Sequence, residues 1–239
     1  MLKQLEQSLS RHPVLLLASG VLLPTLLVWV DSVGNPFSYF RYQLPPGQAL
    51  YILSKLMALV TLSLLWLQCL TALAQRTPTL MMLRPGLLNH RRLGLLILTT
   101  ACLHALLFVL AASLRTGKPA WALLLPLPGE GYYNLHLSFG SMALWLLMLG
   151  GVAGLARWRY NSGWRRWLHL AWLPALVLIS LHGLGIGSET RTGMLRYLYP
   201  LMALSLLAVG IHRSNFFDVE TKSISDRERL NGHRDGKSD

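Results

Sequence analysis

The chain has 239 residues, of which 53% are hydrophobic and only 13% are charged. An ordinary soluble domain carries about 25% charged residues, so this composition excludes a typical soluble protein and indicates lipid as the solvent. The net charge of +12 is dispersed over loops between apolar segments. That distribution suits attraction to anionic lipid head groups and argues against a nucleic-acid-binding protein, which would present basic residues on a compact soluble domain.

Continuously apolar runs of about 20 residues, the length that spans a bilayer core, recur along the chain. They do not alternate apolar and polar residues as the strands of an outer-membrane barrel do. We therefore expect an all-α membrane protein, specifically a six-transmembrane-helix bundle. The expected spans are residues 13–30, 50–74, 93–113, 133–156, 167–187 and 194–211.

The sequence divides into one membrane domain, 13–212, between a short cytoplasmic segment, 1–12, and a polar cytoplasmic tail, 213–239. The first span is longer than a signal-peptide core and is followed by no small-residue cleavage site, so we expect it to be retained. The tail has low hydrophobicity and mixed charge, which predicts disorder or a docking role. The loop of residues 114–131 holds Trp121 and a leucine-rich stretch broken by prolines, which favours a position along the membrane interface.

Lys and Arg fall mainly on one side of the expected bundle. Sixteen of the 22 lie in the N-terminal segment, in the loops around residues 75–92 and 157–166, and in the tail. Positive charge collects in cytoplasmic loops of membrane proteins. We therefore expect both termini of this multi-pass protein in the cytoplasm.

Two of the eight histidines, His104 and His182, lie well inside apolar spans. An ionisable side chain at that depth is rare, usually faces the bundle interior and marks a functional site. The alternative is a neutral imidazole that hydrogen-bonds a neighbouring helix. Three histidines in terminal segments or at a membrane edge are assigned no role: His12, His212 and His233.

Four histidines form a regular pattern around the third and fifth spans. His104 follows His90 by fourteen residues, and His182 follows His169 by thirteen. Both spans run outward from the cytoplasm, so the first member of each spacing lies nearer the cytoplasmic face. In an α-helix, two side chains fourteen residues apart are separated by about 21 Å along the axis and point in directions that differ by about 40°. For a separation of thirteen residues, the directions differ by about 140°. His169 and His182 can therefore share one face only if the helix between them is distorted. Pro174 lies between them, and we expect a kink at this proline.

A cofactor held by one histidine from each of two helices is more consistent with haem than with zinc. Zinc takes three or four ligands at one level, often including thiolate or carboxylate, and neither level offers them. Cys69 and Cys102 are expected to be small packing residues. Haem iron needs two axial ligands, so one or two bis-histidine haems b between the third and fifth spans fit the residues present.

The run HRRLGLLILTTACLH, with the later run WRRWLHLAWLPALVLISLH, resembles the ferric reductase-like transmembrane domain family over residues 49–211. That family includes ferric-chelate reductases, the membrane half of NADPH oxidases, and the haem-binding membrane subunits of bacterial periplasmic methionine sulfoxide reductase systems (MsrQ-like). The resemblance implies haem ligation by His104, His169 and His182. His90 matches the inner ligand of the two-haem members and would then pair with His169, leaving the other two as the outer pair. Otherwise His90 is an ordinary interface residue.

Three further groups of residues have open roles. Arginines beside the inner histidines either pair with haem propionates or only set the topology: Arg91, Arg92, Arg165 and Arg166. Glycines of the spans either let a macrocycle approach the backbone or form ordinary helix contacts: Gly94, Gly140, Gly183, Gly185 and Gly187. His136 either binds a propionate, shapes an outer acceptor site or extends to the surface.

These observations predict a b-type cytochrome of the bacterial inner membrane, the electron-transfer subunit of an oxidoreductase. Many members of the family continue into flavin and nicotinamide domains, but no glycine-rich phosphate fingerprint of such a domain occurs within these 239 residues. We therefore expect electrons from a cytoplasmic flavoprotein reductase carrying FMN or from the quinone pool. The expected acceptor is a ferric chelate or a periplasmic redox protein. The rival interpretation is a haem-free transporter or scaffold whose buried histidines form a proton relay.

Overall fold

The computed structural model describes residues 18–74, 90–127, 129, 131–157, 163–191 and 193–212. Within these residues the regular elements are all helices, and no sheet is present. Five helices are long and apolar enough to cross a membrane, which indicates a multi-pass membrane protein. These candidate spans are Gln48–Leu73, His90–Thr116, Tyr132–Leu155, Trp167–Ile186 and Leu195–His212.

Five of the six expected spans agree with these boundaries to within three residues at each end. The first expected span, 13–30, begins outside the described residues, and the part described belongs to the shorter apolar helix Gly20–Val33. A helix of this length extends about 20 Å, which is less than the thickness of the hydrocarbon core. The expected terminal segments, 1–12 and 213–239, lie outside the described residues.

The described helices include both long and short elements. The N-terminal part consists of a π-helical turn η1 (Ala18–Leu22), α3 (Leu23–Val33) and the short α4 (Ser38–Arg41). The long elements are α5 (Gln48–Ala74), α6 (His90–Thr116), α7 (Tyr132–Arg157), α8 (Gly163–His169) with α9 (Trp172–Ile186), and a C-terminal helix (Leu195–His212). Two short elements, η3 (Trp121–Leu124) and α10 (Ser188–Arg191), lie in the connections.

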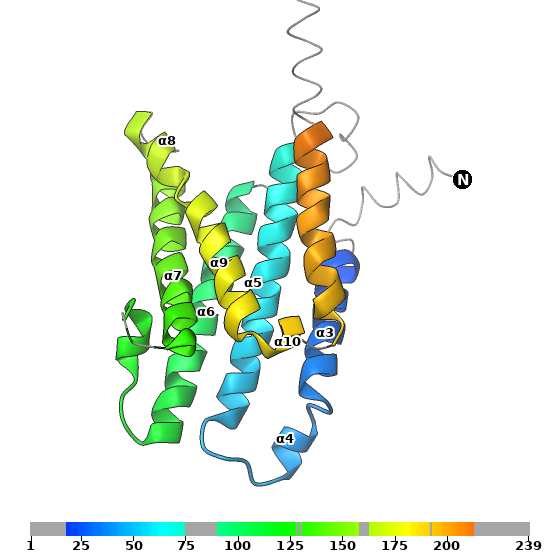
Figure 1. Cartoon of the computed structure of the whole chain (residues 1–239), viewed down its shortest axis with the longest axis vertical. Coiled ribbons are helices and arrows are strands. Elements are labelled where there is room, and N and C mark those ends of the chain that lie inside the picture. Colours follow the sequence, from blue (N-terminus) through cyan, green and yellow to red (C-terminus); the bar gives the residue numbers. More distant parts are fainter. Residues whose placement is uncertain are drawn as a thin grey trace, which may run out of the picture.

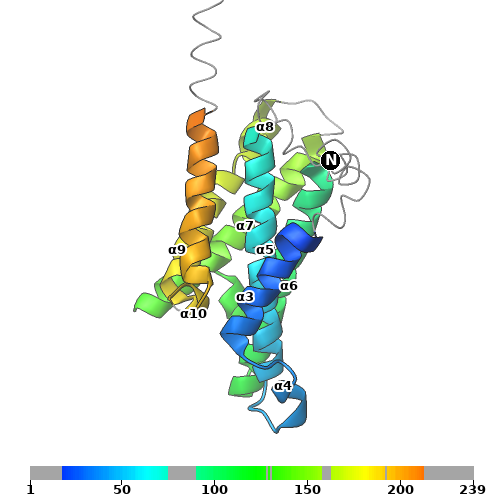
Figure 2. The ribbon, with the colours of Figure 1, turned by 90° about the vertical axis from the view of Figure 1, so that its right-hand side faces the viewer.

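The long helices run alternately up and down beside one another (Figure 1). The most extensive packing joins α5 to α6 and α7 to α9, while α3 packs against α5. Figure 2 looks onto the side of the bundle formed by α3, α5 and the C-terminal helix. The arrangement therefore places α6, which carries His90 and His104, in one bundle with α8 and α9, which carry His169 and His182.

One cluster of buried apolar side chains lies where η1, α5 and α6 meet. Leu64 is completely buried, and Leu93 and Ile97 of α6 are 1% and 3% exposed. Cys69 belongs to the same cluster, as expected for a small packing residue. Many leucines on the outer faces are instead exposed, for example Leu201 at 61%. Exposed leucines at this density suit contact with lipid rather than water.

Hydroxyl groups connect the helices inside this apolar surrounding. Thr61 of α5 donates to the Thr100 hydroxyl of α6 at 2.8 Å. The Thr25 and Ser63 hydroxyls are 2.8 Å apart between α3 and α5, and the Trp66 indole donates to Ser205 of the C-terminal helix at 2.9 Å. Such interhelical bonds stabilise membrane bundles because no water competes for the polar groups.

The helical conformation is interrupted between α8 and α9, at Leu170 and Ala171, which form a turn. The amides of these residues donate to the Trp167 and Leu168 carbonyls, both at 3.0 Å and both three residues back. Pro174 lacks an N–H, and its ring crowds the Leu170 carbonyl four residues before it, which explains a tightened turn at this point. The distortion expected between His169 and His182 is therefore present, as a break between two helices.

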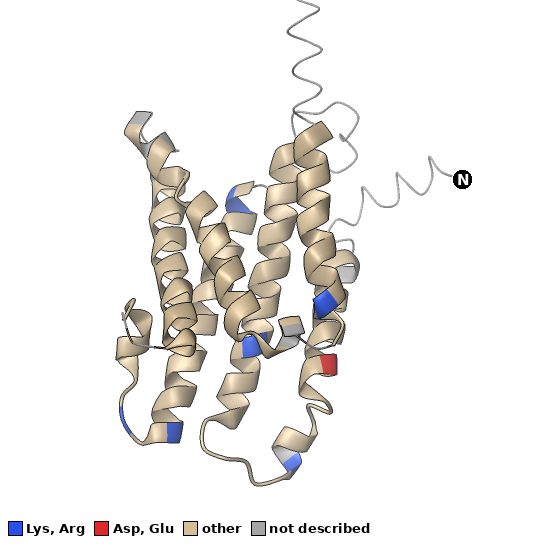
Figure 3. Cartoon of the chain, in the orientation of Figure 1, with Lys and Arg blue, Asp and Glu red and all other residues tan. Residues whose placement is uncertain are grey.

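The charged positions are distributed unevenly along the bundle axis. Figure 3 shows blue segments at the upper end of α6 and in the lower half of the view, with uncharged ribbon between them.

The loop after α6 returns along α7, where the Trp145 indole and the Ser138 hydroxyl donate to the Leu124 and Leu127 carbonyls at 2.9 and 2.6 Å. Trp121 in this loop is 51% exposed, in keeping with the expected interfacial position.

We expect the replacement Leu64→Ala to lower the free energy of unfolding by about 2–4 kcal/mol, because it leaves a cavity in the best-packed part of the bundle. The measurement is an unfolding titration of the detergent-solubilised chain. The lipid-facing replacement Leu201→Ala serves as the control and should change stability little. Equal losses in the two variants would contradict this description of the core.

Candidate functional site

The histidines of α6 lie opposite those of the α8–α9 segment at two levels. The His90 and His169 rings have centroids 6.0 Å apart, with an angle of 80° between their planes. Farther along the bundle, the His104 and His182 ring centroids are 6.5 Å apart at 68°. Because α6 is continuous from His90 to Thr116, the fourteen residues between its two histidines separate the levels by about 21 Å.

We call His90 with His169 the inner pair, and His104 with His182 the outer pair. These are the pairings implied by the family resemblance. The structure brings each pair together even though the thirteen-residue spacing does not fit a continuous helix. The break at Leu170 accounts for the difference, since it frees the orientation of His169 from that of α9.

Three of the four imidazoles are oriented by hydrogen bonds from Nδ1 to a backbone carbonyl of a neighbouring helix. His104 Nδ1 bonds the Ser54 carbonyl at 2.9 Å, and His169 Nδ1 bonds the Gly150 carbonyl at 3.0 Å. His182 Nδ1 bonds the carbonyl of His136 at 2.8 Å. A carbonyl only accepts, so Nδ1 carries the proton in each case. The neutral ring then presents the Nε2 lone pair, which is the arrangement of metal-binding histidines.

Ser54 makes the most extensive of these contacts. It is 1% exposed, its hydroxyl oxygen lies 2.9 Å from His104 Nδ1, and the hydroxyl donates to the His104 carbonyl at 3.0 Å. Together with the Ser54 carbonyl, these contacts fix the His104 ring relative to α5. The His104 ring therefore has little freedom to rotate about its side-chain bonds.

Two glycines of α7 make room for the histidines of the α8–α9 segment. A Cβ atom at Gly140 would lie 2.6 Å from His182 Nδ1, and one at Gly154 would lie 2.9 Å from His169 Nδ1. Real Cβ contacts are not that short, so a larger residue would displace each ring. The close approach is thus possible only because both positions lack a side chain. Fourteen residues separate the two glycines, as they separate the two histidines of α6.

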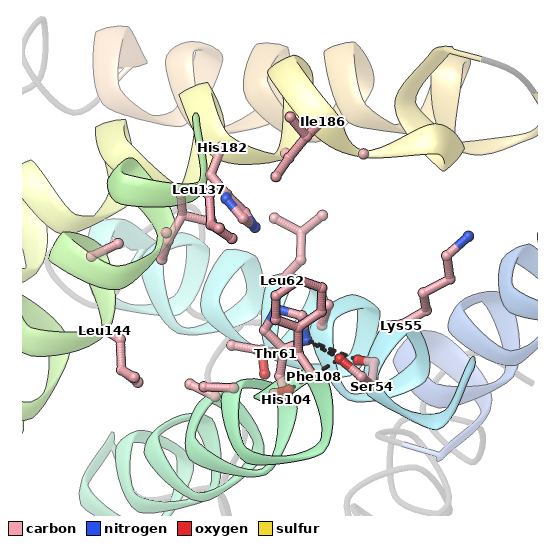
Figure 4. Close-up of a pocket in the computed structure, with 18 of the residues that line it drawn as sticks. Ser54, Lys55, Thr61, Leu62, His104, Phe108, Leu137, Leu144, His182 and Ile186 are labelled. Atoms are coloured by element: carbon pink, nitrogen blue, oxygen red, sulfur yellow. Dashed lines mark hydrogen bonds between the residues drawn. The ribbon is translucent and has the colours of Figure 1, made fainter. Parts of the chain in front are cut away.

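A cavity of ≈ 250 Å³ surrounds the outer pair. Apolar side chains form its inner part, among them Ala101, Leu144 and Ile179, while Tyr51 and Ser188 belong to the lining toward its other end. Figure 4 shows the His182 ring directed into the cavity from α9, with His104 of α6 on the opposite side. A mostly apolar cavity with a few placed polar groups is the usual form of a cofactor site.

The site fits a bis-histidine haem by three independent properties. Two imidazole nitrogens at about 2 Å from one metal put the ring centroids about 6 Å apart, close to the separations at both levels. The Nδ1 bonds leave Nε2 available, and the lining of the outer cavity is mostly apolar.

The other predicted site residues lie as follows. Arg91 and Arg92 are exposed in the first turn of α6, beside the inner pair. Arg165 and Arg166 belong to α8, but their side chains lie outside the described part of the structure. His136 packs its ring against Gly185 of α9 and against the Tyr132 ring, with centroids 4.0 Å apart. Its contribution to the outer pair is the backbone carbonyl that holds His182.

The glycines expected near a macrocycle have different surroundings. Gly140, Gly183 and Gly187 line the cavity, and Gly140 also packs closely against the His182 ring. Gly185 accommodates the His136 ring, and a Cβ atom at Gly94 would lie 3.5 Å from Gln68 Nε2, an ordinary contact between helices.

Sequence reasoning missed three residues of the site: Ser54, Gly154 and Lys55. Ser54 and Lys55 are adjacent polar residues in a mainly apolar span, and such residues indicate a functional site. Gly154 was recognisable only through its fourteen-residue separation from Gly140.

Comparisons with family models, curated proteins and solved structures find no match to this chain. The fold and composition define the class as an all-helical, multi-pass membrane protein. The function is therefore argued from the geometry of the two histidine pairs.

We expect the neutral forms of His104, His169 and His182 in the cofactor-free chain to be Nδ1–H tautomers, the less common tautomer in water. Nitrogen NMR of histidine-labelled protein measures this directly. The replacement Gly140→Ala should shift His182 away from this form, because the new methyl group collides with Nδ1 and breaks a hydrogen bond of about 0.5–1.5 kcal/mol.

Gly210→Ala is the matched control, because a Cβ atom there meets nothing within 4 Å. Nε2–H tautomers at His104 and His182 in the unmodified chain would contradict the geometry described above.

Proposed function

We propose that this chain is a b-type cytochrome that binds two haems, one at each histidine pair, and carries single electrons across the membrane. The observation that supports this most strongly is the separation of 6.0 and 6.5 Å between paired imidazoles at two levels. When bound, haem b supplies reversible one-electron chemistry at iron. The proposal is consistent with the resemblance to ferric reductase-like transmembrane domains noted from the sequence.

The contribution of the chain is to hold the ligands and exclude water. Backbone carbonyls on α5 and α7 accept hydrogen bonds from Nδ1 of three histidines, which leaves the Nε2 atom of each ring available for a ligand-binding role. The surrounding alanine, leucine and isoleucine side chains provide a low dielectric, which tunes a redox centre and limits access of solvent. Two levels about 21 Å apart on α6 span most of the hydrocarbon core.

The proposed orientation has six spans with both termini in the cytoplasm of a bacterial inner membrane. The inner pair then lies at the cytoplasmic side, next to Arg91 and Arg92, as the distribution of positive charge favours. Electrons would enter there from a cytoplasmic flavoprotein or from quinol. The acceptor, a ferric chelate or a periplasmic redox protein, would approach the opposite side, where Arg115 and Lys118 favour an anionic partner.

Absorption spectra of the purified chain, reduced minus oxidised, test the proposal. We expect haem b at two per chain in the unmodified protein. His104→Ala and His182→Ala should each remove about half of the haem, since one axial ligand of the outer pair is lost. His90→Ala and His169→Ala should remove the other half.

His136→Ala is the control and should keep the full haem content, because the carbonyl of residue 136 remains available to His182. Absence of any haem absorption would favour the haem-free proton relay. A single haem that is insensitive to replacement of His90 would contradict the two-haem form of the proposal.

A further inference from the structure

Lys55 is the one charged residue in the sequence of α5, a helix otherwise suited to lipid. It follows Ser54, the residue that orients His104, and it lines the same cavity. A charged side chain within a membrane span is costly and is usually retained for a specific partner. The position of Lys55 thus calls for an explanation within the outer site.

The Lys55 ammonium lies at one end of the outer cavity. Its Nζ donates to the Ser188 hydroxyl at 2.8 Å and is 5.2 Å from the centroid of the Tyr51 ring. The Arg115 guanidinium is 5.8 Å from the same ring centroid. Figure 4 shows the Lys55 side chain reaching along one side of the cavity from α5, away from Leu144.

The described lining of the cavity is therefore asymmetric. Toward the middle of the bundle it is mainly apolar, with Leu144, Leu147 and Ile179, and Thr61 adds a hydroxyl group but no charge. Toward the outer side it includes Lys55 and Ser188, and its described residues include no carboxylate. A ligand with an apolar body and an anionic edge would satisfy both parts, since a buried anion requires a cation or hydrogen-bond donors.

We propose that Lys55 binds a propionate carboxylate of the haem held by the outer pair, and so fixes which edge of the macrocycle faces outward. This inference rests on the proposed function. Haem b carries its two propionate carboxylates on one edge of the macrocycle. An ammonium at one end of the site would therefore favour the orientation in which this edge faces Lys55. Ser188 of α10 adds a hydroxyl at the same place.

The test compares ferric haem with its dimethyl ester, in which both carboxylates are blocked. Each is titrated into the full-length detergent-solubilised chain produced without haem, carrying His169→Ala so that only the outer pair binds. We expect the free acid to bind about tenfold more tightly than the ester, the effect of one charge-assisted hydrogen bond. Lys55→Met should abolish this preference, and Lys55→Arg should retain it.

Lys118→Met is the matched control: it removes an outer-side lysine that does not line the cavity, and the tenfold preference should persist. A preference that is unchanged in Lys55→Met overturns the inference while leaving the haem proposal intact. Equal binding of acid and ester to the chain with Lys55 intact also overturns it, even if Lys55→Met fails to fold. If neither compound binds, the proposed function itself fails.

Discussion

The candidate site depends on one kind of interaction, a hydrogen bond from a histidine Nδ1 to a backbone carbonyl on the neighbouring helix. It occurs at His104, His169 and His182, with carbonyls supplied by Ser54, Gly150 and His136. Backbone carbonyls cannot rotate as side chains do, so they define the direction of each ring. In a bundle with few polar groups, these bonds both satisfy the imidazoles and leave their other nitrogen available.

The packing of the helices is arranged around these rings. Small residues at Gly140 and Gly154 let α8 and α9 approach α7 closely enough for the Nδ1 bonds to form. The tight apolar cluster lies elsewhere, between η1, α5 and α6, where Leu64 is fully buried. The bundle thus combines a close-packed region, which stabilises the helix pairs, with a cavity around the outer histidines.

Much of this arrangement could be predicted from the sequence. The length of the apolar runs predicted five of the candidate spans, and the spacing of His90 from His104 predicted that they share one face of α6. Pro174 indicated a distortion, but not that it would form a break at Leu170. The ligand roles of the histidines stay predictions, since proximity alone does not identify what lies between two rings.

The remaining features depend on the relative register of the helices, which the sequence does not specify. Nothing in the local pattern places Ser54 beside His104 or Gly154 beside His169, because each contact joins helices whose offset is set by packing. Of the six expected spans, the first is represented in the described residues by the short apolar helix Gly20–Val33.

The most direct test of the account is the electron paramagnetic resonance spectrum of the purified, oxidised chain with its haem content. The planes of the paired imidazoles lie at 68° and 80° to each other; as axial ligands of haem, such rings would give low-spin ferric iron with the highly anisotropic signal of nearly perpendicular ligands. Two such centres per chain are the expected result. A chain without bound haem, or one with only high-spin ferric haem, would contradict the claim that the paired histidines are axial ligands.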